Sequence, residues 1–203
     1  MANTIQKLTE AFARFPGIGP RQAKRFVYHL LLQDQEKIGY LSYLLGELKK
    51  EVRICVSCFR FHSESARDLC DICRDPTRDK TLLLIIANDN DLDTVEKSGS
   101  YPGYYFVLGG LTPLFGKNDD SIRIPELIKK TTKMKDDGLV EIIFALAANT
   151  EGDYTAQILK QKLEVVTADS LIKTSLLGRG LSTGTELEYS DTDTIRNALK
   201  NRT

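Results

Sequence analysis

The four cysteines of this 203-residue chain form two pairs, each with C-x2-C spacing. Cys55 and Cys58 make the first pair, Cys70 and Cys73 make the second, and eleven residues separate the pairs. Two such pairs can place four thiolates at the corners of a tetrahedron, the arrangement that Zn²⁺ prefers, with Zn–S distances of about 2.3 Å. Because four sulfur ligands leave no position for water, the spacing predicts one structural Zn²⁺ per chain.

Two disulfide bonds are the alternative use of these cysteines. Such bonds are rare in reducing compartments, and the N-terminus has no basic segment leading into an apolar one. His62 lies between the pairs and is an alternative ligand, although we favour its interpretation as a surface histidine. We expect the loop of about twenty residues to need the metal for its structure, since it has little apolar content.

A second candidate site is the bend Phe15-Pro16-Gly17-Ile18-Gly19-Pro20. Two prolines and two glycines in six residues cannot continue a helix, so the segment from Ile5 to His29 predicts a helix–hairpin–helix. Gly17 and Gly19 let the backbone approach a phosphate, and Pro20 opens a helix whose first amide groups point outward. The bend therefore predicts a site for a DNA phosphate, with a plain tight turn as the alternative.

Three cations follow the bend on one helical face. Arg21, Lys24 and Arg25 are spaced i, i+3 and i+4, and would add full charges to the phosphate site. Nothing in the segment offers a code for base edges, so we expect DNA binding without sequence preference. One hairpin contacts few phosphates, and useful affinity therefore predicts an oligomer with several copies.

The elements that must position these sites follow from hydrophobic spacing. Leucines at helical spacing predict a third helix that ends near Val52, and we expect its apolar stripe to be core. The apolar runs 82–86, 104–108, 141–146 and 164–167 predict buried strands, and segments 92–97, 125–134 and 154–163 predict helices between them. This alternation predicts a mainly parallel sheet covered by helices. Asp191 predicts the start of a last helix through Leu199.

Charge is balanced over the whole chain, with 28 basic and 28 acidic residues. Residues 1–53 nevertheless hold nine basic and five acidic side chains, a net charge of +4. This asymmetry favours an N-terminal surface for polyanions, and ordinary scatter of surface charge is the alternative. The longest apolar stretch, 81–87, is far shorter than the roughly 20 residues of a membrane span, so we expect a soluble cytoplasmic protein that binds no membrane.

The order of short motifs resembles one known family across almost the whole chain. The motifs are F-P-G-I-G-P-R-Q-A-K-R at 15–25, the four cysteines, V-L-G-G at 107–110, E-G-D-Y-T-A at 151–156 and L-E-Y-S-D at 187–191. Together they resemble the RecR family of recombination mediators. The resemblance implies an α/β multidomain protein with a helix–hairpin–helix region (1–53), a small four-cysteine zinc finger (54–76), a Toprim-like domain (77–170) and a C-terminal helical segment resembling a Walker B motif (171–203).

The resemblance also implies a function. Members form a ring-like tetramer around DNA and work with RecO or RecF to promote RecA loading on single-stranded DNA. Arg21 and Arg25 match family positions for DNA contact, and the four cysteines match the zinc ligands. Glu151 and Asp153 match the acidic pair of the Toprim motif, on the face associated with RecO binding.

Departures from Toprim enzymes argue against catalysis. These enzymes hold Mg²⁺ with a glutamate at the end of the first strand and a later acidic cluster, and here Ala87 stands where that glutamate is expected. A Mg²⁺-dependent nuclease or primase-like enzyme, using Glu151, Asp153 and the acidic loop 89–93, is the alternative. Two further departures from the family pattern concern the partner-binding face: Phe106 stands in place of the usual histidine, and Ala-Ala-Asn at 147–149 replaces a more polar turn.

The C-terminal segment has no P-loop, which argues against ATP hydrolysis. Gly178, Gly180 and Gly184 are interpreted as turns. Glu186, Glu188 and Asp191 form either a docking site for a partner or a solvated acidic surface. A zinc-stabilised interaction module that never contacts DNA is the third functional hypothesis.

Overall fold

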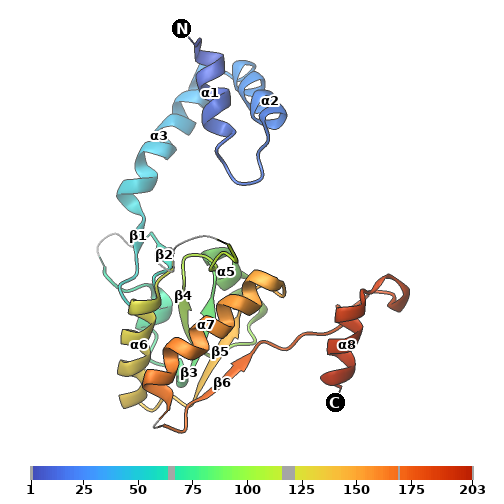
Figure 1. Cartoon of the computed structure of the whole chain (residues 1–203). Coiled ribbons are helices and arrows are strands. Elements are labelled where there is room, and N and C mark those ends of the chain that lie inside the picture. The colour runs from blue at the N-terminus through green and yellow to red at the C-terminus, as the bar shows by residue number, and fades with distance from the viewer. Residues whose placement is uncertain (1, 64–66, 116–121, 169, 203) are drawn as a thin grey trace. The chain divides into compact units, whose positions relative to one another are not determined.

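The computed structural model describes residues 2–63, 67–115, 122–168 and 170–202 (Figure 1). The chain divides into two compact units, Met1–Val52 and Arg53–Thr203. No helix of the described residues is long and apolar enough to cross a membrane.

The first unit consists of three helices, as the sequence predicts. They are α1 (Thr4–Phe12), α2 (Pro20–Leu31) and α3 (Gln35–Glu51). α1 begins with a capping box, in which Asn3 and Gln6 exchange hydrogen bonds between their side chains and backbone amides. Buried Ala23 and Val27 of α2, and the ring of Phe26 against Phe12, hold the first two helices together.

The apolar stripe of α3 is not core, and that prediction was wrong. None of the helix's residues is buried, and Leu45 is 62% exposed. The other leucines of the stripe, Leu41, Leu44 and Leu48, are exposed as well. Helical spacing establishes which residues share a face, but another element must cover that face, and no described element of this unit does so.

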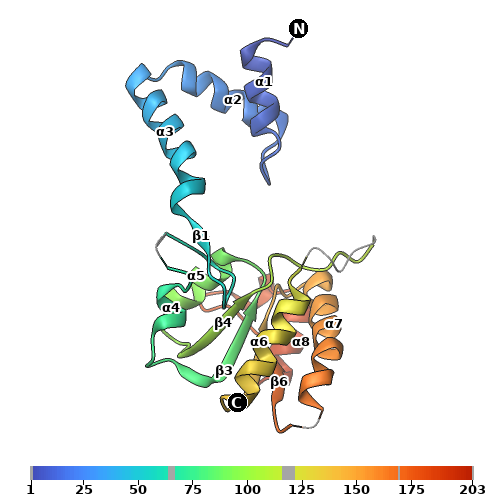
Figure 2. The ribbon, with the colours of Figure 1, turned by 90° about the vertical axis from the view of Figure 1, so that its left-hand side faces the viewer.

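The second unit is built on a parallel sheet with the strand order β4-β3-β5-β6 (Figures 1 and 2). Its strands are β3 (Asp79–Ile86), β4 (Gly103–Val107), β5 (Glu141–Ala145) and β6 (Lys173–Leu176). The helices between them are α5 (Asp89–Ser98), α6 (Ile124–Asp136) and α7 (Thr150–Thr167). The predicted helix-covered parallel sheet is thus confirmed.

Alternate residues of β3 face different cores. Leu83 and Ile85 pack in the core that contains residues of α6 and α7. Leu84 and Ile86 pack in the core that contains Leu92 of α5 and the cysteine segment. Both faces of the sheet are therefore covered, which explains why its strands are continuous apolar runs.

The strand predicted at 164–167 is instead the end of α7, so that prediction was wrong. Leu159, Leu163 and Val166 share the buried side of the helix at helical spacing, whereas Val165 is 82% exposed. The 3.6-residue period of the longer segment prevails over the short apolar run. The fourth strand is β6, later in the chain.

The remaining elements are short. The cysteine segment contains the antiparallel pair β1 (Arg53–Ile54) and β2 (Phe61–His62), and α4 (Asp71–Arg74). The C-terminal segment contains the 3-10 turn η2 (Leu187–Tyr189) and α8 (Thr192–Lys200). Asp191 caps α8, as predicted, by accepting hydrogen bonds from two backbone amides of its first turn.

Candidate functional site

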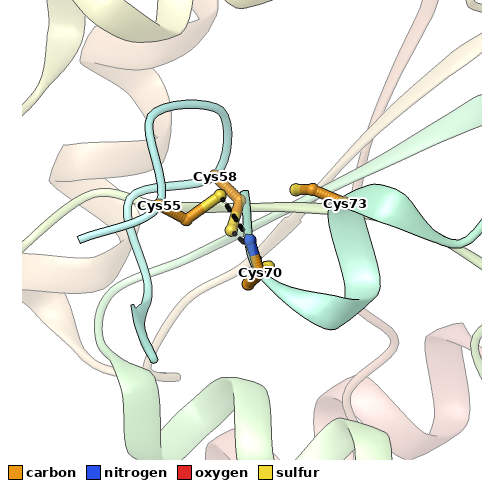
Figure 3. A group of neighbouring side chains, drawn as sticks. All are labelled: Cys55, Cys58, Cys70 and Cys73. Carbon is orange, nitrogen blue, oxygen red and sulfur yellow. Dashed lines mark hydrogen bonds between the residues drawn. The ribbon is translucent and has the colours of Figure 1, made fainter. Parts of the chain in front are cut away.

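The four cysteine side chains converge on one point (Figure 3). Cys55 and Cys58 lie in the turn between β1 and β2, whereas Cys70 precedes α4 and Cys73 lies in it. All four sulfur atoms lie within 4.8 Å of one another, and the Sγ atoms of Cys58 and Cys70 are 3.6 Å apart. Tetrahedral zinc with Zn–S bonds of about 2.3 Å needs sulfur atoms about 3.8 Å apart, so the cluster fits this ion.

The same geometry does not fit disulfide bonds. All four cysteines are free, and a disulfide needs sulfur atoms about 2.0 Å apart. Cys55, Cys58 and Cys70 are buried, and Cys73 is partly buried. The backbone N–H of Cys70 donates to Cys55 Sγ at 3.4 Å, an interaction that favours a thiolate at that position.

Hydrogen bonds among the thiols shift their pKa values in different directions. Its contact with Cys58, and then those with Cys70 and Cys73, lower the pKa of the Cys55 thiol. The contact with Cys55 raises the pKa of Cys58. Four thiols this close together share hydrogen bonds, and all four must be deprotonated to hold a cation.

His62 lies outside this cluster and is buried, 8% exposed, so the surface histidine favoured from the sequence was wrong. Neither ring nitrogen has a hydrogen-bond partner among the described residues. Its place in β2, paired with Arg53 of β1, brings the ring inward. A two-residue strand is too short for alternation to reveal this in the sequence.

The cysteine segment is joined to the sheet by backbone and charged contacts. The N–H of Val107 donates to the carbonyl of Cys58 at 2.8 Å, and the N–H of Phe61 donates to the carboxylate of Asp89 at 2.7 Å. Arg60 lies between the carboxylates of Asp71, at 3.2 Å, and Asp93, at 3.8 Å. The metal candidate is therefore part of the larger unit's interior.

These contacts also account for the acidic residues 89–93, which begin α5 and are not a loop. Asp89 accepts from Phe61, Asp93 faces Arg60, and Asp91 forms the capping box of α5 with Asn88. Ala87 is buried at the end of β3. Within the described parts of the chain, the cysteines are the group of three or more metal-ligating side chains close enough to hold one ion.

Glu151 and Asp153 lie in the first turn of α7, with different surroundings. Glu151 is exposed, whereas the carboxylate of Asp153 accepts two hydrogen bonds from the guanidinium of Arg179, one of them at 3.2 Å. This contact raises the pKa of Arg179. The side chain of Asn201, beyond α8, donates to the backbone carbonyl of Arg179 at 2.8 Å. Sequence reasoning missed Arg179 because 26 residues separate it from its partner.

Gly152 stands between these acidic residues for a steric reason. A Cβ atom there would lie 1.9 Å from the carbonyl oxygen of Ala147. The side chain of Asn149 caps the same turn by accepting from the N–H of Gly152 at 2.8 Å. The glycine thus permits the tight connection from β5 to α7. This connection places the carboxylates of Glu151 and Asp153 at the start of α7.

The hairpin residues lie together at the start of α2. Gly19 is the N-cap, Pro20 is the first residue of the helix, and no side chain of the described residues caps it. Gly17 has a φ of 75°, which favours glycine, and open space surrounds both glycines. Arg21, Lys24 and Arg25 are all exposed, so their charges face the solvent beside this helix end.

The fold and these sites define a class: a multidomain α/β protein with an N-terminal helical hairpin unit and a cluster of four cysteines, able to hold a metal ion, packed on a parallel sheet. Residues 5–48 match the family model described as RecR, helix-hairpin-helix. The chain is 40% identical over 196 residues to the Recombination protein RecR of Prochlorococcus marinus (strain MIT 9303), covering 96% of this chain and 98% of that relative.

Two further relatives extend the comparison. The Recombination protein RecR of Rubrobacter xylanophilus is 34% identical over 202 residues, covering 99% of this chain and 96% of the relative. That of Legionella pneumophila (strain Philadelphia 1) is 35% identical over 201 residues, covering 98% and 96%. The chain belongs to the RecR family, which confirms the resemblance drawn from its motifs.

Proposed function

We propose that this chain is a non-enzymatic, DNA-binding recombination mediator in DNA repair. In this proposal it forms an oligomeric clamp and works with RecO or RecF to promote RecA loading on single-stranded DNA. The observation that carries the proposal is the exposed, uncapped start of α2, with three cations beside it, in a chain of the RecR family.

DNA contact is supported by the free groups at that helix end. The first backbone amides of α2 have no side-chain acceptor among the described residues, and a helix N-terminus attracts anions. The space around Gly17 and Gly19 leaves room for a phosphate. Arg21, Lys24 and Arg25 would add charge without reading bases, so binding depends on salt rather than sequence.

A ring-like homotetramer needs contacts between copies of the chain, and the exposed apolar surface of the first unit can supply one of them. The leucines of α3 and the end of α2, where Leu32 is 84% exposed, leave apolar surface in water. A second copy of the same unit can cover it without a further partner, because a symmetric contact pairs one surface with itself. Several hairpins would then contact one DNA strand together.

RecO or RecF binding is assigned to the face of Glu151 and Asp153. The exposed carboxylate of Glu151 supports this assignment, and the half-exposed Asp153, paired with Arg179, lies beside it. We also propose that the chain has four parts, divided at residues 53, 76 and 170, of which the second and third share one core.

A structural Zn²⁺ held by Cys55, Cys58, Cys70 and Cys73 completes the proposal. When bound, the ion would supply a cross-link rather than chemistry, because four protein ligands leave no open position. Three of the carboxylates that a Mg²⁺-dependent enzyme would use have other partners: Asp153 pairs with Arg179, Asp93 faces Arg60, and Asp89 accepts from the backbone of Phe61. This engagement supports a role without catalysis.

The test is DNA binding by the full-length protein as a function of salt. The double variant Arg21→Ala/Arg25→Ala removes two phosphate contacts, so the slope of log affinity against log salt falls by about 1.4 on single strands. The control, Lys37→Ala/Lys50→Ala, removes two charges from the same unit that already pair with Asp34 and Glu47. Equal binding by both variants and the parent protein refutes the hairpin as the DNA site.

A further inference from the structure

Three lysines lie around a small cavity beside the cysteine cluster. Lys80 comes from β3, and Lys130 and Lys133 come from successive turns of α6. We call these residues the lysine pocket. The cavity has a volume of about 160 Å³, and its lining also includes Ser57, Cys73 and Tyr104.

Lys130 has a fixed position in this pocket. Its ammonium group donates to the hydroxyl of Ser57 at 2.9 Å and to the carbonyl of Ser57 at 3.2 Å. It also lies 6.0 Å from the centre of the Tyr104 ring. Ser57 stands between the two cysteines of the first pair, so a residue of α6 fixes the backbone that presents them.

The charge of the pocket complements that of a metal–thiolate centre. Four thiolates and one Zn²⁺ carry a net charge of −2, by the formal charges of the ligands. Asp137 is the one acidic residue in the lining, so three lysines leave the pocket at +2. Cys73, the least buried of the four cysteines, faces this charge.

We propose that Lys130 is a positioning residue of the metal centre: it holds the first cysteine pair through Ser57 and, with Lys80 and Lys133, offsets the negative charge of the thiolates. The inference rests on the proposed zinc site. Residues that hydrogen-bond around metal ligands tune metal affinity, and their loss costs roughly 10- to 100-fold.

Zinc affinity of the full-length protein, measured by competition with a chelator, tests this role. Lys130→Met removes the charge and both donors but keeps an unbranched side chain, and we expect a roughly tenfold loss of affinity. Lys130→Arg keeps the charge and restores part of that loss. Lys129→Met, at an exposed neighbouring position of α6, leaves the affinity unchanged.

A second control separates positioning from general stability. Ile142→Val trims a buried side chain of β5 in the core that contains none of the four cysteines, and therefore lowers the melting temperature while the hydrogen bonds from Lys130 to Ser57 stay in place. If it lowers zinc affinity as much as Lys130→Met does, or if Lys130→Met keeps the parent affinity, the role of Lys130 is overturned. If the parent protein itself binds no zinc, the proposed metal site fails first.

Discussion

The steric requirement at Gly152 gives a prediction whose size follows from the structure. In Gly152→Ala the new methyl group would lie 1.9 Å from the Ala147 carbonyl oxygen and 2.9 Å from its carbon. Both partners are backbone, so no side-chain rotation relieves the clash. Overpacking of this kind costs about 1–3 kcal/mol, and a forced shift of the helix start adds to it because the Asn149 cap contributes about 1 kcal/mol.

Urea unfolding followed by circular dichroism measures this loss. We expect the free energy of unfolding to fall by about 2–4 kcal/mol, with a fall in melting temperature of roughly 4–15 °C for a unit of this size. Gly46→Ala provides a contrasting control, since Gly46 lies inside α3 with nothing within 4 Å of its Cβ position. There the same substitution stabilises the helix by up to about 1 kcal/mol.

The two substitutions must therefore act in opposite directions. A Gly152→Ala protein as stable as the parent would refute the tight connection between β5 and α7. Loss of stability in both variants would instead indicate that alanine is unfavourable in each helix for reasons other than the contact with Ala147.

Three further predictions concern charge, assembly and the last helix. The hydrogen bond from Arg78 lowers the pKa of Glu96. The stabilisation that this ion pair gives the fold is therefore complete above the unfolded pKa of about 4.3 and is lost as the pH falls through the lower folded pKa. Glu96→Gln should flatten the acid side of the curve of stability against pH. Leu45→Glu places a charge in the exposed stripe of α3 and should reduce the particle mass measured by light scattering. Asp191→Ala removes the cap of α8 and should cost about 1 kcal/mol of helix stability, seen as faster amide exchange in 192–200.

Each of these predictions has a result that contradicts it. An unchanged acid limb for Glu96→Gln would exclude the ion pair with Arg78 as a source of pH dependence. An unchanged mass for Leu45→Glu would leave the stripe without a role in assembly. Exchange as slow as in the parent protein would show that α8 needs no cap.

Local chemistry explains why much of the fold was predictable. The C-x2-C spacing of the cysteines by itself determines that their side chains can meet at one ion. The continuous apolar runs of β3, β4 and β5 arise because both faces of the sheet are covered. Caps such as Asp191 act within a few residues of their position. These signals need no knowledge of distant parts of the chain.

The failures share a dependence on distant partners. Whether the apolar stripe of α3 is buried depends on which element covers it. Residues 164–167 are helical because they continue the long helix α7, whose buried side chains recur at helical spacing. The ion pair of Asp153 with Arg179 joins two segments that no spacing rule connects. The same holds for Lys130 and Ser57, which lie 73 residues apart.

The cysteine segment supplies side chains to the core on one face of the sheet. A bound ion would therefore stabilise the whole larger unit, because the cysteine segment is not a separate domain. In a chain synthesised during metal starvation, α5 alone would cover this face of β3 and β4, and degradation of the incompletely folded protein would compete with maturation. The abundance of this repair factor would then follow the supply of zinc in the cell.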